Sequence, residues 1–177
     1  LAVAVFMIFA RFSDNQSRKI ANAIAAADTP EKLKEMIKKH GDHPNCDFAR
    51  LRLAEMLVKD KNYEEAMKIY QALCSSRHAE VAERAKLNVG YVLELAGKKE
   101  EACAKLEQAG NDPLLSQPTI TEANYNAARI YDSLGQKDKA KACLAKIKLP
   151  AGPESMTPGA PGSFWATKIE RLKDSLE

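Results

Sequence analysis

The sequence predicts an all-α protein, an α-solenoid built from stacked helical hairpins. Three observations predict this class. Alanine, lysine, leucine and glutamate, which are strong helix formers, dominate the 177 residues. One pattern of small and large apolar residues occurs three times without a gap. A polar or glycine-containing break (residues 59–62, 97–99 and 135–137) then divides each copy into two segments with helical periodicity.

Three segments of equal length define this repeat. They cover residues 48–73, 84–109 and 122–147, so successive copies begin 36 and then 38 residues apart. Four positions keep their residue type: small (Ala54, Gly90, Ala128), large apolar (Leu57, Leu93, Tyr131), small again (Ala66, Ala102, Ala140) and large apolar again (Tyr70, Leu106, Leu144). Small residues let two antiparallel helices approach closely. A leucine at Ala66 or Ala102 is therefore expected to overpack the contact, at about 1–3 kcal/mol.

This pattern resembles the tetratricopeptide repeat (TPR), whose eighth, eleventh, twentieth and twenty-fourth positions carry the same residue types. The resemblance implies a right-handed α-solenoid with a TPR-like array over residues 28–149 and hairpins at 47–76, 80–109 and 120–149. The motif's helix-ending proline is absent, and the spacing exceeds the usual 34 residues. Divergent repeats are therefore expected.

Two helices are predicted ahead of the first copy, where they could form a degenerate leading repeat. Asp28 is expected to cap one of them, with Glu31 completing a capping box. The apolar face of that helix consists of Leu33, Met36 and Ile37, and the turn at residues 40–44 ends it. Residues 16–27 form the other helix, with a face made of Ile20, Ala23, Ile24 and Ala27.

The end of the chain is predicted to be a loop followed by a capping helix. Residues 150–162 contain four prolines and three glycines, which excludes a helix. Residues 163–177 begin with Ser163 as a plausible N-cap. Their apolar face consists of Trp165, Ile169, Leu172 and Leu176. Such a helix would close the end of the solenoid with a polar outer face.

Composition and motifs argue against several function classes. The net charge is +3, with lysine and glutamate interspersed, so no nucleic-acid partner is expected. No phosphate loop, nucleophile elbow or HExxH motif occurs, so we expect no enzyme and no cofactor. His40, His43 and Cys46, with Asp42 and Asp47 nearby, are residue types that suit zinc, but the segment is a turn at a helix end and no fourth ligand is obvious in the sequence. An exposed polar turn is the better interpretation, and no metal is expected.

The four cysteines form no CxxC pair. In a TPR hairpin, Cys46 would start the first helix and Cys74 would end the second, and antiparallel packing brings those ends together. A disulfide between them could form in an oxidising compartment, whereas reduced thiols would fit the cytosol. Cys103 and Cys143 lie on successive second helices and are expected to be packed thiols.

The TPR resemblance implies that proteins or peptides bind on the concave face lined by the first helices. The residues that the motif places there are Arg52, Glu55, Arg84, Asn88, Tyr91, Tyr125, Asn126 and Arg129. Asparagine and arginine can hydrogen-bond a peptide, and tyrosine adds contact area; the alternative is that all are merely solvated. The carboxylate clamp of chaperone-cofactor TPRs needs Lys and Asn where this chain has Leu51 and Glu55, so that function is rejected.

An apolar run opens the chain, because Leu1–Ala10 contains no polar residue. Residues 1–12 are too short to span a bilayer, which takes about 20 residues. Since the chain begins with Leu, we expect the end of a truncated membrane anchor, followed by a helical stem to residue 27. A signal peptide fits less well, because no small-x-small cleavage site follows. Alternatively, the run docks on a partner or forms a homo-oligomer of a soluble adaptor.

The order of anchor, stem, TPR-like units and closing helix resembles bacterial single-span membrane proteins with an extracytoplasmic TPR-like domain, including the Sec translocon ancillary subunit. The most telling stretches are AVFMIFARF, the run ARLRLAEMLVKDKNYEEAMKIYQAL from Ala49, and AARIYDSLGQKDKAKACLAKI. The resemblance implies an inner-membrane scaffold that contacts translocon or chaperone components during protein export or envelope assembly. Arg11, Arg18 and Lys19 follow the run and disfavour an outward orientation, so a cytoplasmic location stays the alternative.

Overall fold

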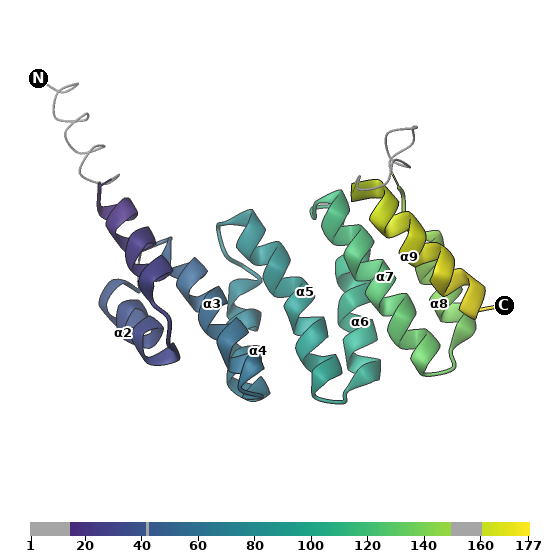
Figure 1. Ribbon diagram of the computed structural model, residues 1–177, viewed down its shortest axis with the longest axis horizontal. Coiled ribbons are helices and arrows are strands. Elements are labelled where there is room, and N and C mark those ends of the chain that lie inside the picture. Colours follow the sequence, from purple (N-terminus) through teal and green to yellow (C-terminus); the bar gives the residue numbers. More distant parts are fainter. Residues whose placement is uncertain (1–14, 42, 150–160) are drawn as a thin grey trace, which may run out of the picture. The chain divides into compact units, whose positions relative to one another are not determined.

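The computed structural model describes residues 15–41, 43–149 and 161–177, with side chains for all of these except 161–163. The described residues form helices joined by turns (Figure 1). The chain divides into two compact units, residues 1–85 and 86–177, with the boundary inside helix α5 (Ala79–Leu95). None of the described helices is long and apolar enough to cross a membrane. The expected anchor at residues 1–12 and most of the expected loop at 150–162 lie outside the described residues.

Unit 1 starts with a helix over residues 15–26, followed by α2 (Pro30–His40), α3 (Cys46–Lys59) and α4 (Tyr63–Leu73). The expected leading helices are thus confirmed. The first buries Ile20 and Ile24, and Ala27 is buried just after its last residue, while Ala23, which we expected on the same face, is exposed. Within α2, Leu33 and Met36 are buried. Helix α3 packs against both α2 and α4.

The start of α2 differs from the prediction by one residue. Thr29, and not Asp28, is the N-cap, and its Oγ1 accepts a hydrogen bond from the backbone N–H of Lys32 at 3.3 Å. Thr29 is extended, with φ −130° and ψ 153°, because Pro30 disfavours a helical conformation in the residue before it. Asp28 instead accepts from the Lys32 ammonium at 2.6 Å.

The first helix of each repeat ends in the same way. Lys61, Gly97 and Gly135 occupy equivalent positions and have left-handed backbones, with φ of 60°, 80° and 72°. The next residue then donates its N–H back across the turn in each copy, as Asn62 does to the Leu57 carbonyl at 2.8 Å. The matching bonds run from Lys98 to Leu93 and from Gln136 to Tyr131, both at 2.9 Å. This arrangement is the Schellman motif, and it confirms the breaks predicted between paired helices.

Small residues lie where the paired helices approach most closely. Ala54 on α3 and Ala66 on α4 are fully buried, as are Ala102, Ala128 and Ala140 in unit 2. At Gly90 there is no room for even a methyl group, because a Cβ there would lie 2.5 Å from Cγ of Leu106. The predicted helical hairpins are therefore confirmed, and the protein is an all-α solenoid of TPR-like hairpins.

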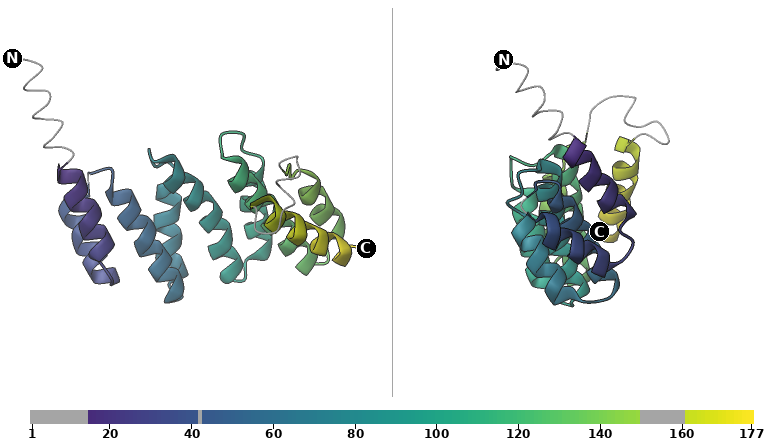
Figure 2. Two further views of the ribbon diagram at one scale, coloured as in Figure 1. Left: turned by 45° about the horizontal axis from the view of Figure 1, so that its top comes forward. Right: turned by 90° about the vertical axis from the view of Figure 1, so that its left-hand side faces the viewer.

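Unit 2 contains the rest of α5, then α6 (Lys99–Gly110), α7 (Gln117–Ser133), α8 (Lys137–Ala145) and α9 (Pro161–Ser175) (Figure 2). Helix α7 packs against α6 and α8. Helix α9 buries Ile169, Leu172 and Leu176, as expected of a capping helix, and leaves Trp165 half-buried. It begins two residues before Ser163, at Pro161, because proline is favoured in the first turn of a helix.

Two side chains cap the helix that precedes their own. Arg50 on α3 donates from Nη2 to the carbonyl of Gly41, which ends α2, at 2.7 Å. Asn124 on α7, at the equivalent repeat position, donates from Nδ2 to the carbonyl of Gly110, the last residue of α6, at 3.0 Å. These bonds satisfy carbonyls that a helix end leaves without intrahelical partners.

Candidate protein-binding surface

In unit 1, the residues expected on the binding face contact the protein itself. Arg52 donates from Nη1 to the carbonyls of Ile24 and Ala25 at 2.7 and 3.2 Å, at the end of the helix over residues 15–26. Glu55 lies 3.6 Å from the guanidinium of Arg84. Both partners of this ion pair are substantially exposed, so it contributes little to stability and leaves both groups accessible to a ligand.

In unit 2, Tyr91 and Asn126 belong to a hydrogen-bonded network between α5 and α7. The Tyr91 hydroxyl donates to Oε1 of Glu122 at 2.6 Å. Asn126 donates from Nδ2 to the same hydroxyl at 3.1 Å and to the backbone carbonyl of Glu122 at 2.8 Å. These polar groups satisfy one another without a ligand.

Arg129 extends this network through a bidentate pair with Glu94. Its Nη1 and Nη2 donate to the two carboxylate oxygens at 2.8 and 2.7 Å, which is the strongest geometry for such a pair. The hydrogen bonds that Arg129 donates to the Glu94 carboxylate raise the pKa of Arg129, against the opposing effect of burial. Glu94 and Glu122 were not expected in the site, since the motif's register alone does not identify the partners of its inward-facing residues.

The repeat does contain a signal for one of these partners. Glu55 pairs with Arg84, and Tyr91 pairs with Glu122. In both cases the residue directly after the first small residue of one copy (Ala54 or Gly90) meets the first residue of the next copy. An alignment of the copies would thus have identified Glu122 as the partner of Tyr91. The pair of Arg129 with Glu94 has no equivalent pair between the first two copies, so the alignment would not have identified Glu94.

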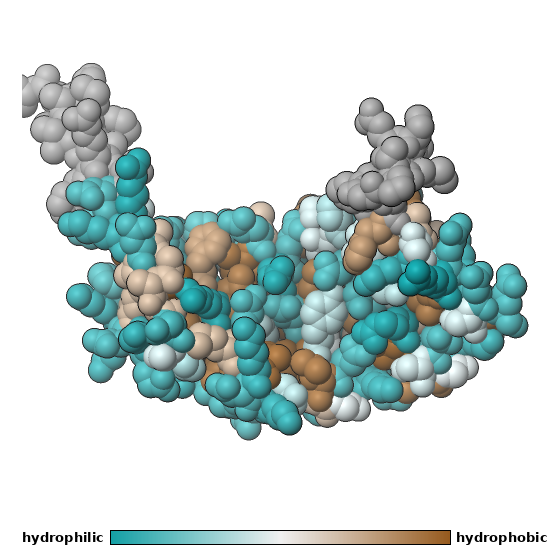
Figure 3. Space-filling view, viewed as in Figure 1, coloured by the Kyte–Doolittle hydropathy of each residue, from teal (hydrophilic) through white to brown (hydrophobic). Residues whose placement is uncertain are grey.

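Asn88 and Tyr125 have different surroundings. The side chain of Asn88 is half-buried and has no hydrogen-bond partner among the described residues. The Tyr125 ring contacts Trp165 of α9 edge-on, with centroids 5.4 Å apart. Phe164, beside it, is 55% exposed, and Figure 3 shows hydrophobic surface near the start of α9 among hydrophilic residues. Helix α9 therefore adds aromatic side chains that the motif's register did not predict.

Cys46 and Cys74, the pair considered for a disulfide, are both thiols in the structure. Cys46 is fully buried and donates from Sγ to the carbonyl of His40 at 2.8 Å, which satisfies a carbonyl at the end of α2. The same ends of the hairpin are also linked by Ser76, whose hydroxyl donates to Asp47 at 2.6 Å.

The turn after α2 uses its histidine in hydrogen bonds. His43 accepts at Nδ1 from the backbone N–H of Asn45 at 3.2 Å, and its Nε2 lies 3.3 Å from the Ser17 hydroxyl. Both ring nitrogens thus have protein partners. Among the described residues no group of three or more His, Cys, Asp or Glu is arranged to hold a metal ion.

Cys103 and Cys143 are buried, as expected of packed thiols. Burial raises the pKa of Cys103 to about 11 and that of Cys143 to about 12, and nearby Glu107 adds to both shifts. Cys143 also contacts a carboxylate oxygen of Glu107 at 3.7 Å. Since the thiolate is the reactive form, these two cysteines are chemically inert at neutral pH.

Comparison with known proteins identifies the type of repeat in two of the hairpins. Residues 48–76 and residues 121–147 each match a model of the tetratricopeptide repeat. The chain contains TPR repeats. The first match covers most of α3 and all of α4, and the second covers most of α7 and all of α8. TPR repeats generally bind proteins and generally serve as non-catalytic scaffolds, so they indicate a protein–protein interaction scaffold.

A solved structure supports the same fold. The crystal structure of a tetratricopeptide repeat protein from Parabacteroides merdae superposes with a TM-score of 0.56 at 16% sequence identity. The match covers 93% of this chain and 60% of the other, so this chain spans less than two thirds of that protein. At this identity the likeness concerns the fold alone. No curated protein matches the sequence.

Proposed function

We propose that the protein is a non-enzymatic scaffold that binds proteins or peptides through the A helices of its TPR hairpins, α3, α5 and α7. The observation that carries the proposal is the presence of TPR hairpins whose A helices present polar and aromatic side chains. The side chain of Asn88 has no hydrogen-bond partner among the described residues, and the Glu55–Arg84 pair is exposed. These groups can pair with a peptide at little cost to the folded protein.

Site-specific photocrosslinking in cells tests this proposal. A photoreactive phenylalanine analogue replaces Asn88 on A helix α5. In a matched variant it replaces Lys105, which is exposed on α6, the second helix of the same hairpin. We expect defined protein adducts from position 88 and few from position 105. Equal adducts at both positions, or none at position 88, would argue against binding through the A helices.

We further propose that residues 1–12 anchor the scaffold in a bacterial inner membrane, where it assists protein export or envelope assembly. The unbroken apolar run Leu1–Ala10 and the order of segments along the chain support this proposal. On this proposal the TPR-like domain is extracytoplasmic, and its partners are translocon or chaperone components.

Two measurements test the membrane proposal. After expression of the whole gene, the protein should stay in the membrane fraction in alkaline carbonate. Added protease should degrade it in spheroplasts whose inner membrane is intact, which reports exposure outside the cytoplasm. Release by carbonate would contradict the anchor. Protection until the membrane is lysed would place the domain in the cytoplasm, the orientation that Arg11, Arg18 and Lys19 would favour.

A further inference from the structure

Helix α9 presents a second set of side chains at its border with α7. We define the α7–α9 border as Tyr125 of α7 together with Phe164, Trp165, Lys168 and Arg171 of α9. The Lys168 ammonium lies 4.5 Å from the centroid of the Phe164 ring, 5.5 Å from that of Tyr125 and 5.7 Å from that of Trp165. Three rings thus surround one cation, and the ring faces attract it electrostatically.

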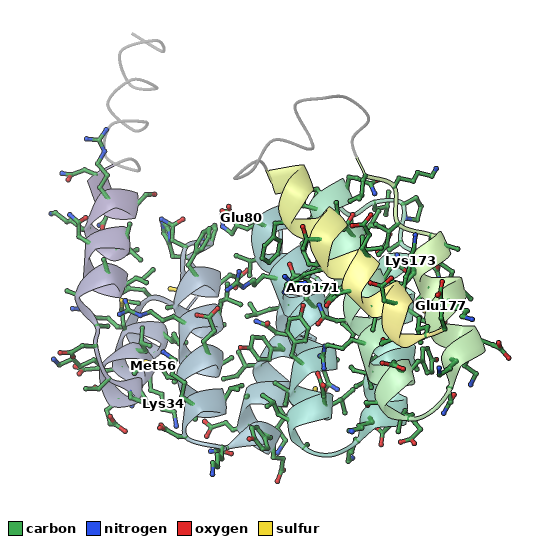
Figure 4. The ribbon with its side chains drawn as sticks, turned by 45° about the vertical axis from the view of Figure 1, so that its right-hand side comes forward. Lys34, Met56, Glu80, Arg171, Lys173 and Glu177 are labelled. Atoms are coloured by element: carbon green, nitrogen blue, oxygen red, sulfur yellow. The ribbon has the colours of Figure 1, made fainter. Side chains whose placement is uncertain are left out.

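The contacts of α9 fix which of its sides borders α7. Lys168 lies over Tyr125, and the Ser175 hydroxyl donates to Oδ2 of Asp132 at 3.3 Å, with both partners on α7. Phe164, Lys168, Arg171 and Ser175 follow one another at spacings of four, three and four residues, so they share this side of the helix. Figure 4 shows Arg171 and Lys173 on opposite sides of α9.

Arg171 at this border is available to a ligand, whereas Arg129 in the neighbouring network on α5 and α7 is not. Arg171 is exposed and has no hydrogen-bond or ion-pair partner among the described residues. By contrast, Arg129 is bound to Glu94 in a bidentate pair. Of the exposed acidic residues of α9, Glu170 lies outside the Phe164–Arg171 row, while Asp174 lies three residues after Arg171 but forms no ion pair with it among the described residues. Asp132 of α7 accepts from Ser175 at the far end of the row. Arg171 therefore remains available to a negatively charged ligand on the α7 side of the helix.

We propose that the α7–α9 border binds an acidic peptide segment that carries an aromatic or large aliphatic side chain. Carboxylates pair with Arg171 and Lys168, and the apolar side chain packs against the exposed face of Phe164 beside Trp165. Arginine and large aromatic residues are the side chains that most often dominate protein interfaces. Anionic lipid is a poorer fit, because its recognition usually takes clusters of four to eight basic residues. This inference rests on the proposed scaffold function and gives it a partner chemistry and a location.

Fluorescence anisotropy with the full chain tests the proposal. The probe is a short fluorescein-labelled peptide rich in aspartate and glutamate, with phenylalanine near its centre. Arg171→Glu is expected to weaken binding about tenfold or more, and Phe164→Ala to weaken it by a similar factor. Lys173→Glu is the matched control, because it makes the same charge change on the other side of α9 and is expected to alter affinity less than about twofold. Binding should also weaken as salt is raised.

Several results would overturn the proposal. Equal losses in Arg171→Glu and Lys173→Glu would mean that the net charge acts without a local site. Unchanged binding of a probe whose acidic residues are replaced by asparagine and glutamine would exclude carboxylate recognition. Binding to vesicles containing phosphatidylglycerol that depends on Arg171, without peptide binding, would assign the surface to lipid. Self-association that Arg171→Glu abolishes would assign it to a second copy.

The two proposals fail in different ways. If the photoreactive group at position 88 captures proteins but the acidic probe does not bind, the scaffold function stands and the α7–α9 border is excluded. If the probe binds through Arg171 while position 88 captures nothing, binding through the A helices fails and the border remains. Circular dichroism of each variant confirms that the helices are intact, which is expected because Arg171 and Lys173 are both exposed.

Discussion

Gly90 of α5 packs directly on Leu106 of α6, and replacing it with alanine tests the packing of α5 on α6. An added Cβ would lie 2.5 Å from Cγ and 2.7 Å from Cδ2 of Leu106, whereas carbon atoms pack at roughly 3.5–4.0 Å. Leu106 is fully buried, so its side chain has little room to move away. Overpacking of this kind costs about 1–3 kcal/mol.

A second effect of the same substitution has the opposite sign. Alanine is the better helix former by about 1 kcal/mol. Because Cγ lies near the base of the leucine side chain, we expect the steric term to lie near the top of its range. Gly90→Ala should then lower the free energy of unfolding by about 2 kcal/mol, and the melting temperature by roughly 4–8 °C for a chain of this size.

Denaturant unfolding followed by circular dichroism measures this change, and a double-mutant cycle assigns it. Leu106→Ala alone leaves a cavity and should cost about 2–5 kcal/mol. Leu106→Ala removes the atoms that the new Cβ at position 90 would meet, so the double variant should be more stable than the sum of the single changes by about 3 kcal/mol, the full steric term. Gly135→Ala is the control, since its φ of 72° strains an alanine but no atom lies near its Cβ. A stabilised Gly90→Ala, or additive changes, would refute the reasoning.

Three further predictions concern other contacts in unit 2. Gly110→Ala places a Cβ 2.6 Å from three atoms of the Asn124 side chain and should lower the free energy of unfolding by about 1–3 kcal/mol, a loss that thermal unfolding would detect. A double-mutant cycle of Arg129→Ala with Glu94→Ala should give a coupling of about 1 kcal/mol that shrinks in high salt; no coupling would mean that the pair is fully solvated. The buried thiols Cys103 and Cys143, whose pKa values rise from 9.0 to about 11 and about 12, should make stability fall as pH rises from 9 toward 12. In that window the unfolded chain releases their protons first, so replacing both cysteines with alanine should flatten the pH dependence of unfolding.

The hairpins could be predicted from the sequence because their determinants are local. Ala66 and Gly135, for example, lie where the repeat pattern requires a small residue and a left-handed turn. Both shifted helix starts involve proline. Pro30 and Pro161 lie in the first turns of α2 and α9, so the preference of proline for that position would have corrected Asp28 and Ser163.

The partners of the binding-face residues could be predicted only in part. Pairs such as Tyr91 with Glu122 follow from the repeat, because equivalent positions meet between successive A helices. The pairing of Arg129 with Glu94 depends on the distance between two particular helices and on the direction of a long side chain. The contact of Tyr125 with Trp165 depends on how α9 returns after residues 150–160, and no local pattern encodes that.

The capping of α2 by Arg50 and of α6 by Asn124 has a consequence for synthesis on the ribosome. The carbonyl of Gly41 obtains its partner only when Arg50 has been added, and the carbonyl of Gly110 only when Asn124 has been added. During translation, the newest helix end therefore stays frayed until the next helix emerges and docks. Each cap thus makes the completion of one helix conditional on the arrival of the next, which favours folding in order from the N-terminus.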